Sequence, residues 1–322
     1  MFTLAELEAA AALVHAVMPP TPQHVWPLLS QRVGCEVVVK HENHTPTGAF
    51  KVRGGIVYMT ELQQSGAAPG GVITATRGNH GQSIARAATA AGIPATILVP
   101  HGNSAEKNAA MRAFGATLIE HGQDFDEAKA EAGRLAEARG LHMVPSFHAA
   151  LVKGVATYAL ELFRGAPDLA AVYVPIGLGS GICGVIAARD LLGLETKVIG
   201  VVAETAPAYA LSFEAGRPVP TNSARTFADG MAVREPHPSA VAMICRGAET
   251  VQRIGETEIA EAMRVYYEDT HNIAEGAGAA PLAALMRDRQ RWQGRRVAVV
   301  LSGGNVDRPV YGQVLAGLTP QV

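Results

Sequence analysis

An alternation of short apolar runs with alanine-rich helical stretches is the feature that most restricts the fold of this chain. The runs lie beside glycine or proline, as at Val72–Ala75, Ala95–Val99 and Ala170–Val174. Parallel strands joined by crossover helices produce this pattern, because strands that are covered on both faces are apolar along their length. The chain is therefore predicted to be α/β, with two doubly wound parallel-sheet lobes.

The order of the runs places one lobe inside the sequence of the other. A small domain is predicted over residues 52–147, with strands at Val72–Ala75, Ala95–Val99, Ala116–Ile119 and Leu141–Val144 and helices from about Ser104 and from Phe125 to Ala138. A large domain is predicted from residues 1–51 and 148–322, with strands at Val37–Lys40, Ala170–Val174, Val198–Val202 and Arg296–Leu301. In such folds the loops at the carboxyl ends of the strands line a ligand-binding cleft.

Composition excludes several kinds of partner. The chain has 27 basic and 29 acidic side chains, and a net charge of -2 is too even for a nucleic-acid binder. No run of about 18 apolar residues predicts a membrane span, and the first residues predict an amphipathic helix, not a secretion signal. Cys35, Cys183 and Cys245 form no CxxC pair, which fits a reducing compartment, so a cytoplasmic protein is expected.

A lysine lies in the first segment that carries chemistry. The stretch His41–Gly55 follows a predicted strand and contains Phe50, Lys51 and Arg53. Desolvation beside Phe50 and a neighbouring cation at Arg53 would lower the pKa of the Lys51 amine, which favours imine formation at neutral pH. Taken alone, the segment is explained more simply by a solvated surface lysine.

A glycine-rich loop follows the predicted strand Ala170–Val174 and precedes a helical stretch. The loop contains Gly177, Leu178, Gly179, Ser180 and Gly181. Backbone N–H groups that converge at a helix start can hold a phosphate. Gly179, Gly181 and Gly184 also satisfy GxGxxG, with Glu204 at the end of the next strand, as a dinucleotide site requires. These residues leave a phosphate cup, an NAD-dependent oxidoreductase and a purely structural turn open.

Two further loops follow predicted strands. The first is rich in donors that suit a carboxylate, and it contains Thr76, Arg77, Gly78, Asn79 and His80. The second contains Ser302, Gly303, Gly304 and Asn305. Taken singly, each loop is explained as well by ordinary turn and helix-start residues.

Together, these loops resemble the fold-type II pyridoxal-phosphate enzymes, and within them the threonine dehydratase and serine racemase family. The similarity runs in order through Thr47–Gly54, Gly78–His80, Gly177–Gly181, Thr226–Gly230, Glu275–Ala279 and Ser302–Asn305. Leu178 and Ser180 replace two glycines of the commonest phosphate-cup sequence, which leaves the backbone donors in place. A nicotinamide enzyme would leave Lys51, Asn79 and Ser302 unexplained, so the resemblance favours pyridoxal phosphate.

The resemblance implies a role for each position. Lys51 would hold pyridoxal 5′-phosphate as a Schiff base and then remove the α-proton of the substrate. Asn79 would bond the cofactor 3′-oxygen, and Ser302 would face the ring nitrogen. The implied cofactor-binding set is Lys51, Phe50, Asn79, Gly177, Leu178, Gly179, Ser180, Gly181, Glu275, Ser302 and Gly303. The implied substrate-binding set is Thr76, Arg77, Gly78, Asn79 and His80.

The activity that the resemblance implies is an ammonia-lyase in a homodimer. Such an enzyme dehydrates a 3-hydroxy amino acid to a 2-oxo acid and ammonia by α,β-elimination. The substrate would be threonine, serine, or a bulkier or acidic analogue such as 3-phenylserine or 3-hydroxyaspartate. The alternatives are an NAD-dependent oxidoreductase, a serine racemase-like activity, and a non-enzymatic protein that binds an amino acid or a nucleotide.

Two positions depart from the family pattern. Arg77 stands where the racemase branch usually has serine, and a guanidinium is a poor proton donor or acceptor. Arg77 would instead pair with a substrate carboxylate or stack on an aromatic ring, unless it points outward. Glu204 and the carbonyl of Ala208 align with a divalent-cation site of some relatives, but Ala210 replaces an expected aspartate. The loss of that carboxylate weakens a site for a hard cation.

Overall fold

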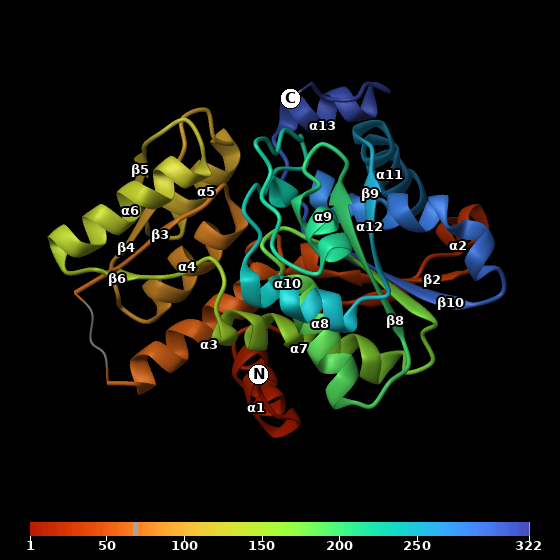
Figure 1. The fold of residues 1–322 in the computed structure, drawn as a ribbon, viewed down its shortest axis with the longest axis horizontal. Coiled ribbons are helices and arrows are strands. Elements are labelled where there is room, and N and C mark those ends of the chain that lie inside the picture. The colour runs from red at the N-terminus through yellow and green to blue at the C-terminus, as the bar shows by residue number, and fades with distance from the viewer. Residues whose placement is uncertain (67–69, 322) are drawn as a thin grey trace.

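The computed structural model describes residues 1–66 and 70–321, which form two α/β lobes (Figure 1). The large lobe has a six-stranded sheet with the order β1-β2-β10-β7-β8-β9, and the small lobe has a four-stranded sheet with the order β5-β4-β3-β6. Among the strand pairs in the described residues, only β1 and β2 run antiparallel. The predicted class, α/β with two parallel-sheet lobes, is confirmed.

The elements have the following bounds. The strands are β1 (Gln23–Val25), β2 (Glu36–His41), β3 (Val72–Ala75), β4 (Ala95–Val99), β5 (Thr117–Glu120), β6 (His142–Met143), β7 (Ala171–Pro175), β8 (Lys197–Ala203), β9 (Thr250–Ile254) and β10 (Arg296–Leu301). The α-helices are α1 (Leu4–His15), α2 (Pro27–Val33), α3 (Lys51–Gln64), α4 (Asn79–Ala90), α5 (Ala105–Ala113), α6 (Phe125–Arg139), α7 (Ala149–Gly165), α8 (Ser180–Leu191), α9 (Ala208–Ala215), α10 (Pro238–Gly247), α11 (Glu256–Thr270), α12 (Gly276–Arg287) and α13 (Arg308–Leu315). The 3-10 helices are η1 (Glu42–His44), η2 (Asp229–Met231) and η3 (Arg289–Trp292).

The large sheet is covered on both faces, which explains its continuous apolar strands. Alternate residues of a strand point to opposite faces. On β10, Ala298 and Val300 belong to the core under α7, α8 and α10, whereas Val297 and Val299 belong to the core under α11 and α12. The small sheet is covered in the same way, with α3 and α4 on one face and α6 on the other. No helix in the described residues is long and apolar enough to cross a bilayer.

Two strands of the large sheet were not predicted. β1 has only three residues and is largely exposed, and β9 reads Thr-Val-Gln-Arg-Ile with polar residues inside it. Both lie at an edge of the sheet. An edge strand has one free side, so it needs no long apolar run and gives little signal in the sequence.

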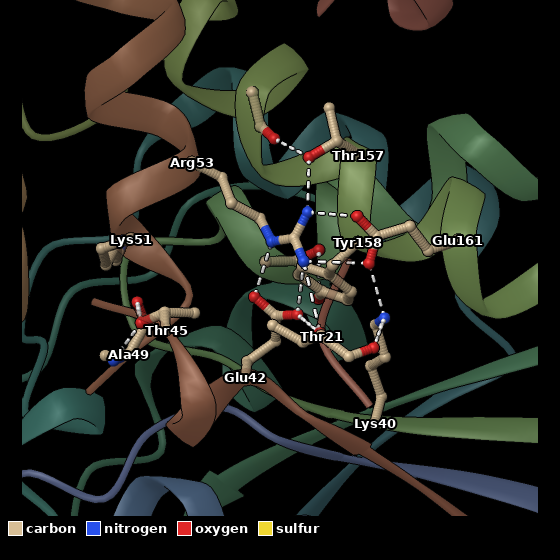
Figure 2. A network of polar contacts seen from close by, with 12 residues as sticks. Thr21, Lys40, Glu42, Thr45, Ala49, Lys51, Arg53, Thr157, Tyr158 and Glu161 are labelled. Carbon is tan, nitrogen blue, oxygen red and sulfur yellow. Dashed lines mark hydrogen bonds and ion pairs between the residues drawn. The ribbon is translucent and has the colours of Figure 1, made fainter. Parts of the chain in front are cut away.

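A buried ion network joins the start of α3 to α7 (Figure 2). Arg53 donates to the two carboxylate oxygens of Glu42 at 2.8 and 3.0 Å and to those of Glu161 at 2.6 and 2.9 Å. Lys40 from β2 donates to Glu161 at 2.6 Å, so two cations balance two carboxylates. The side chains of Arg53, Lys40 and Glu42 are 0% exposed. The network therefore fixes the first turn of α3, which begins at Lys51.

Removal of one partner from this network should be costly. We expect Arg53→Met to lower the free energy of unfolding by about 3–5 kcal/mol, because Glu42 is then buried without a compensating cation. Urea unfolding followed by circular dichroism measures the change. Arg164→Met is the matched control, since Arg164 pairs with Glu8 at the surface, where an ion pair contributes about 0–1 kcal/mol. Equal losses in the two variants would contradict the proposed importance of the network.

Candidate active site

A cavity lies between the lobes, at the carboxyl ends of strands from both sheets. The lining brings together segments from β3–α4, β7–α8 and the loop after β10. Almost every residue that the sequence analysis selected lines the cavity, namely Phe50, Lys51, Thr76, Arg77, Gly78, Asn79, His80, Gly177, Leu178, Gly179, Ser180, Gly181, Glu275 and Ser302. The four predicted loops therefore form one site.

Lys51 is the first residue of α3 and its amine faces the glycine loop. Its Nζ donates to the hydroxyl of Ser180 at 2.9 Å and lies 5.0 Å from the centre of the Phe50 ring. Burial lowers the pKa of the Lys51 amine to about 8. The predicted contribution of Arg53 to this shift is wrong, because the charge of Arg53 is taken up by Glu42 and Glu161. Desolvation alone activates this amine.

The glycine loop supplies a cup of backbone donors. It joins β7 to α8, and the first i to i−4 hydrogen bond at this helix start runs from the Cys183 N–H to the Gly179 carbonyl at 3.0 Å. The N–H groups before Cys183 are therefore left for an anion. A Cβ atom at Gly177 would lie 2.3 Å from the carbonyl oxygen of Gly230, and Gly179 has φ of +96°. Glycine is therefore required at both positions.

The Asn79 side chain connects the small lobe to the large one. Its Nδ2 donates to Glu275 Oε1 at 2.7 Å, and its Oδ1 accepts from Asn305 Nδ2 at 2.8 Å. The neighbouring His80 is buried, and burial lowers its pKa to about 3, with a smaller effect from the Lys51 charge. His80 is therefore uncharged, so a carboxylate at this loop would be held by N–H groups and not by an imidazolium ion.

Lys107 also lines the cavity, although no motif in the sequence predicted it. Lys107 lies on α5, and its Nζ donates to Asp229 Oδ1 and Oδ2 at 2.9 and 2.7 Å and lies 3.3 Å from Glu275 Oε2. Burial opposes the charge of Lys107, but the two carboxylates outweigh it and raise its pKa. No local signal marks this residue, since a lysine on a polar helix is ordinarily solvated.

Arg77 lies where the cavity opens into a larger one of about 740 Å³. The residues shared by the two linings are Arg77, Phe125, Ser146, Leu178, Ala232 and Val233. The Nε atom of Arg77 is buried and has no hydrogen-bond partner within residues 1–66 and 70–321. Arg77 therefore contributes to both linings, and no residue in the described part of the chain fixes its Nε atom by a hydrogen bond.

Three predicted residues lie away from the cavity lining. Gly303 lies behind Glu275, where a Cβ atom would be 2.5 Å from Glu275 Oε1, so Gly303 shapes the site without lining it. Glu204 and Ala208 lie at the end of β8 and the start of α9, outside the lining. In the part of the chain that the structure describes, no group of three or more His, Cys, Asp or Glu residues could hold a metal ion.

The family of the chain follows from comparison with known proteins. A family model described as "Pyridoxal-phosphate dependent enzyme" matches residues 16–303, so the chain belongs to the pyridoxal-phosphate dependent enzymes. The resemblance to the fold-type II threonine dehydratase and serine racemase family is confirmed by relatives in sequence and in structure. This membership removes the nicotinamide alternative for the glycine loop.

Three similar proteins illustrate the relationship. L-threonine ammonia-lyase of Thermotoga maritima is 35% identical over 319 residues, which cover 98% of this chain and 78% of that protein. L-threo-3-hydroxyaspartate ammonia-lyase of a Pseudomonas species is 30% identical over 298 residues, 92% of this chain and 93% of that protein. The processed form of threonine deaminase isoform 2 from Solanum lycopersicum superposes with a TM-score of 0.89 at 29% identity, covering 98% of this chain and 94% of that one.

The residues of the site fit the cofactor of this family, pyridoxal 5′-phosphate. A phosphate monoester needs a cup of donors, and the start of α8 offers unbonded N–H groups beside glycines that keep the backbone close. The aldehyde needs an unprotonated amine, and the pKa of Lys51 is lowered toward that state. The donor set and the amine face each other, because Lys51 Nζ bonds to Ser180 in the cup.

The lowered pKa of Lys51 predicts how the cofactor-free protein reacts with pyridoxal phosphate. We expect the rate of attachment to rise with pH and level off above about 8, because only the unprotonated amine attacks an aldehyde; an ordinary lysine would level off near 10.4. Stopped-flow absorbance measures this rate, and borohydride reduction followed by peptide mapping locates the label.

The control for this experiment is Lys153→Ala, since Lys153 pairs with Glu61 outside the cavity lining. It should label like the wild type, whereas Lys51→Ala should not label at the site. A label that persists in Lys51→Ala would show that another amine binds the cofactor.

Proposed function

We propose that this chain is a pyridoxal-phosphate-dependent ammonia-lyase that converts a 3-hydroxy amino acid into a 2-oxo acid and ammonia. The observation that carries the proposal is the desolvated Lys51 amine, which faces a backbone phosphate cup across a cavity shared by both lobes. The ammonia-lyase relatives support the same reaction class.

Bound pyridoxal phosphate would supply an aldehyde that joins the substrate amine and withdraws electrons from Cα. Backbone N–H groups at Gly179–Gly181 would hold its phosphate. Ser302, which is 3% exposed and lines the cavity, would face its ring nitrogen. A neutral hydroxyl at Ser302 cannot keep that nitrogen protonated as a carboxylate would, which favours elimination over transamination.

Lys51 is the base in this proposal. When the substrate amine is joined to the aldehyde in place of Lys51, the free amine of Lys51 would take the proton from Cα. The C3–oxygen bond then breaks, and the hydroxyl leaves as water with the proton that Lys51 has taken from Cα. The free enamine tautomerises to an imine, and addition of water to its C=N bond gives the 2-oxo acid and ammonia. Burial lowers the pKa of the Lys51 amine to about 8, which favours the unprotonated form that a base requires.

The role of Lys51 is tested by following ammonia and 2-oxo acid release. We expect Lys51→Ala to lower kcat by more than about 10²-fold, as the loss of a general base does. The Lys153→Ala variant should keep wild-type turnover. Turnover in Lys51→Ala close to that of the wild type would rule out Lys51 as the base.

We propose further that the substrate carries an acidic group on C3. Arg77 lines both cavities, its Nε forms no hydrogen bond within the described residues, and the larger cavity has room for a substituent larger than a methyl group. A guanidinium binds a carboxylate through two parallel hydrogen bonds, which gives it preference over neutral groups. A relative that shares this chain's length is named for 3-hydroxyaspartate. The guanidinium also argues against racemisation, because it does not exchange protons at accessible pH.

A substrate panel tests the role of Arg77. For Arg77→Ser we expect kcat/KM on 3-hydroxyaspartate to fall about tenfold or more relative to threonine, since a hydrogen bond to a charged group contributes about 1.5–3 kcal/mol. The panel includes threonine, serine, 3-phenylserine and 3-hydroxyaspartate. Arg112→Ser, at an exposed arginine on α5 that pairs with Glu120, is the control. An unchanged order of preference in Arg77→Ser would show that Arg77 does not select the substrate.

A further inference from the structure

Two carboxylates of the large lobe, the buried Glu275 and the partly exposed Asp229, share a single cation that comes from the small lobe. Asp229 lies on η2 and Glu275 precedes α12, whereas Lys107 lies on α5 of the small lobe. The side chain of Lys107 is 5% exposed and that of Glu275 is 4% exposed. The resemblance to known enzymes assigned no role to Lys107.

The two oxygens of Glu275 are held differently. Oε1 accepts a hydrogen bond from Asn79 at 2.7 Å, whereas Oε2 has no hydrogen bond within the described residues and faces only the Lys107 ammonium at 3.3 Å. Burial raises the pKa of Glu275 most, the Asp229 charge raises it further, and Lys107 and Asn79 lower it. The ionised form of Glu275 therefore depends on groups that the small lobe provides.

The other residues packed on Glu275 carry no charge. Gly303 has no side chain, and its backbone carbonyl accepts a hydrogen bond from the Glu275 N–H at 3.0 Å. Gly230, which also has no side chain, lies near Glu275 Oε1. The charged groups that act on Glu275 in the described part of the chain are thus Lys107 from α5 and Asp229 from η2. Without Lys107, the charged group that remains beside Glu275 in the described residues is Asp229, which has the same sign.

We propose that Lys107 is a positioning residue that reaches across from the small lobe to keep Glu275 ionised and directed at Asn79 when the two lobes are closed. The carboxylate then fixes the Asn79 amide, whose other side is held by Asn305. Without Lys107, Glu275 would face the Asp229 charge alone, which favours its protonated form.

The pKa of Glu275 can be measured without any cofactor. The cofactor-free protein is labelled with [δ-¹³C]glutamate, the Glu275 carboxyl signal is assigned as the one that Glu275→Gln removes, and the signal is followed by NMR against pH. We expect Lys107→Met to move the midpoint up, because a cation is lost, and Lys107→Arg to restore it toward the wild-type value. Asp229→Asn should move the midpoint down, because a like charge is lost.

Arg234→Met is the matched control for lobe contact. Arg234 also joins the lobes, through Asp124 and Asp126, but it does not touch Glu275. It should leave the Glu275 midpoint in place. If the Glu275 midpoint is unchanged in both Lys107→Met and Asp229→Asn, the inference is overturned. A shift in Arg234→Met as large as that in Lys107→Met would overturn it as well. Since Lys107→Met and Asp229→Asn are expected to shift in opposite directions, either variant decides the matter if the other fails to fold.

The consequence for the loaded enzyme rests on the proposed function and on the bond between Asn79 and the cofactor 3′-oxygen that the family resemblance implies. There we expect Lys107→Met to move the pH midpoint of the visible cofactor absorbance upward and to lower kcat at neutral pH by at least about tenfold, or ~1.4 kcal/mol, with KM nearly unchanged. In the Glu275→Gln background, Lys107→Met should shift the absorbance no further. Absence of any cofactor band in the wild type would refute the proposed function, while the NMR titration would still test Lys107.

Discussion

The burial of one primary amine between two lobes is the constraint on which the site depends. Lys51 loses water because Phe50 and the glycine loop enclose it, and this loss lowers its pKa to about 8. The amine must nevertheless stay in place, and its helix is fixed two residues later by Arg53, whose charge is fully paired. Two neighbouring basic residues thus have separate roles. Desolvation leaves the Lys51 amine reactive, whereas the paired Arg53 guanidinium holds the backbone of α3 in place.

The charges around the cavity come from both lobes. The large lobe brings two carboxylates, Asp229 and Glu275, and the small lobe brings Lys107 and Arg77. Lys107 is satisfied by the two carboxylates, whereas the Nε of Arg77 is not bonded within the described residues. Lys107 is therefore fixed by ion pairs within the protein, whereas Arg77 is the residue that we propose to recognise an acidic group of the substrate.

The sequence predicted the loops well because each lies directly after an apolar strand, and the ends of parallel strands meet at one edge of a sheet. Gly177–Gly181 and Asn79 could be recognised in this way. Lys107 could not, because its partners lie more than a hundred residues away and nothing near it departs from a solvated helix. The expected effect of Arg53 on the pKa of Lys51 was wrong for a related reason. Arg53 is close to Lys51 in the sequence, but its charge is compensated by Glu161 on α7, which is far away in the sequence. Long-range pairing of charges leaves no local pattern.

Arg53 on α3 is hydrogen-bonded to Glu161 on α7, so one guanidinium ties these two helices together (Figure 2). The strands of the small sheet, β3 to β6, all lie between the two helices in the sequence. The segments that flank the small sheet are therefore held to each other by a buried ion pair. α3 and α7 cannot separate at this point without leaving buried charges unpaired.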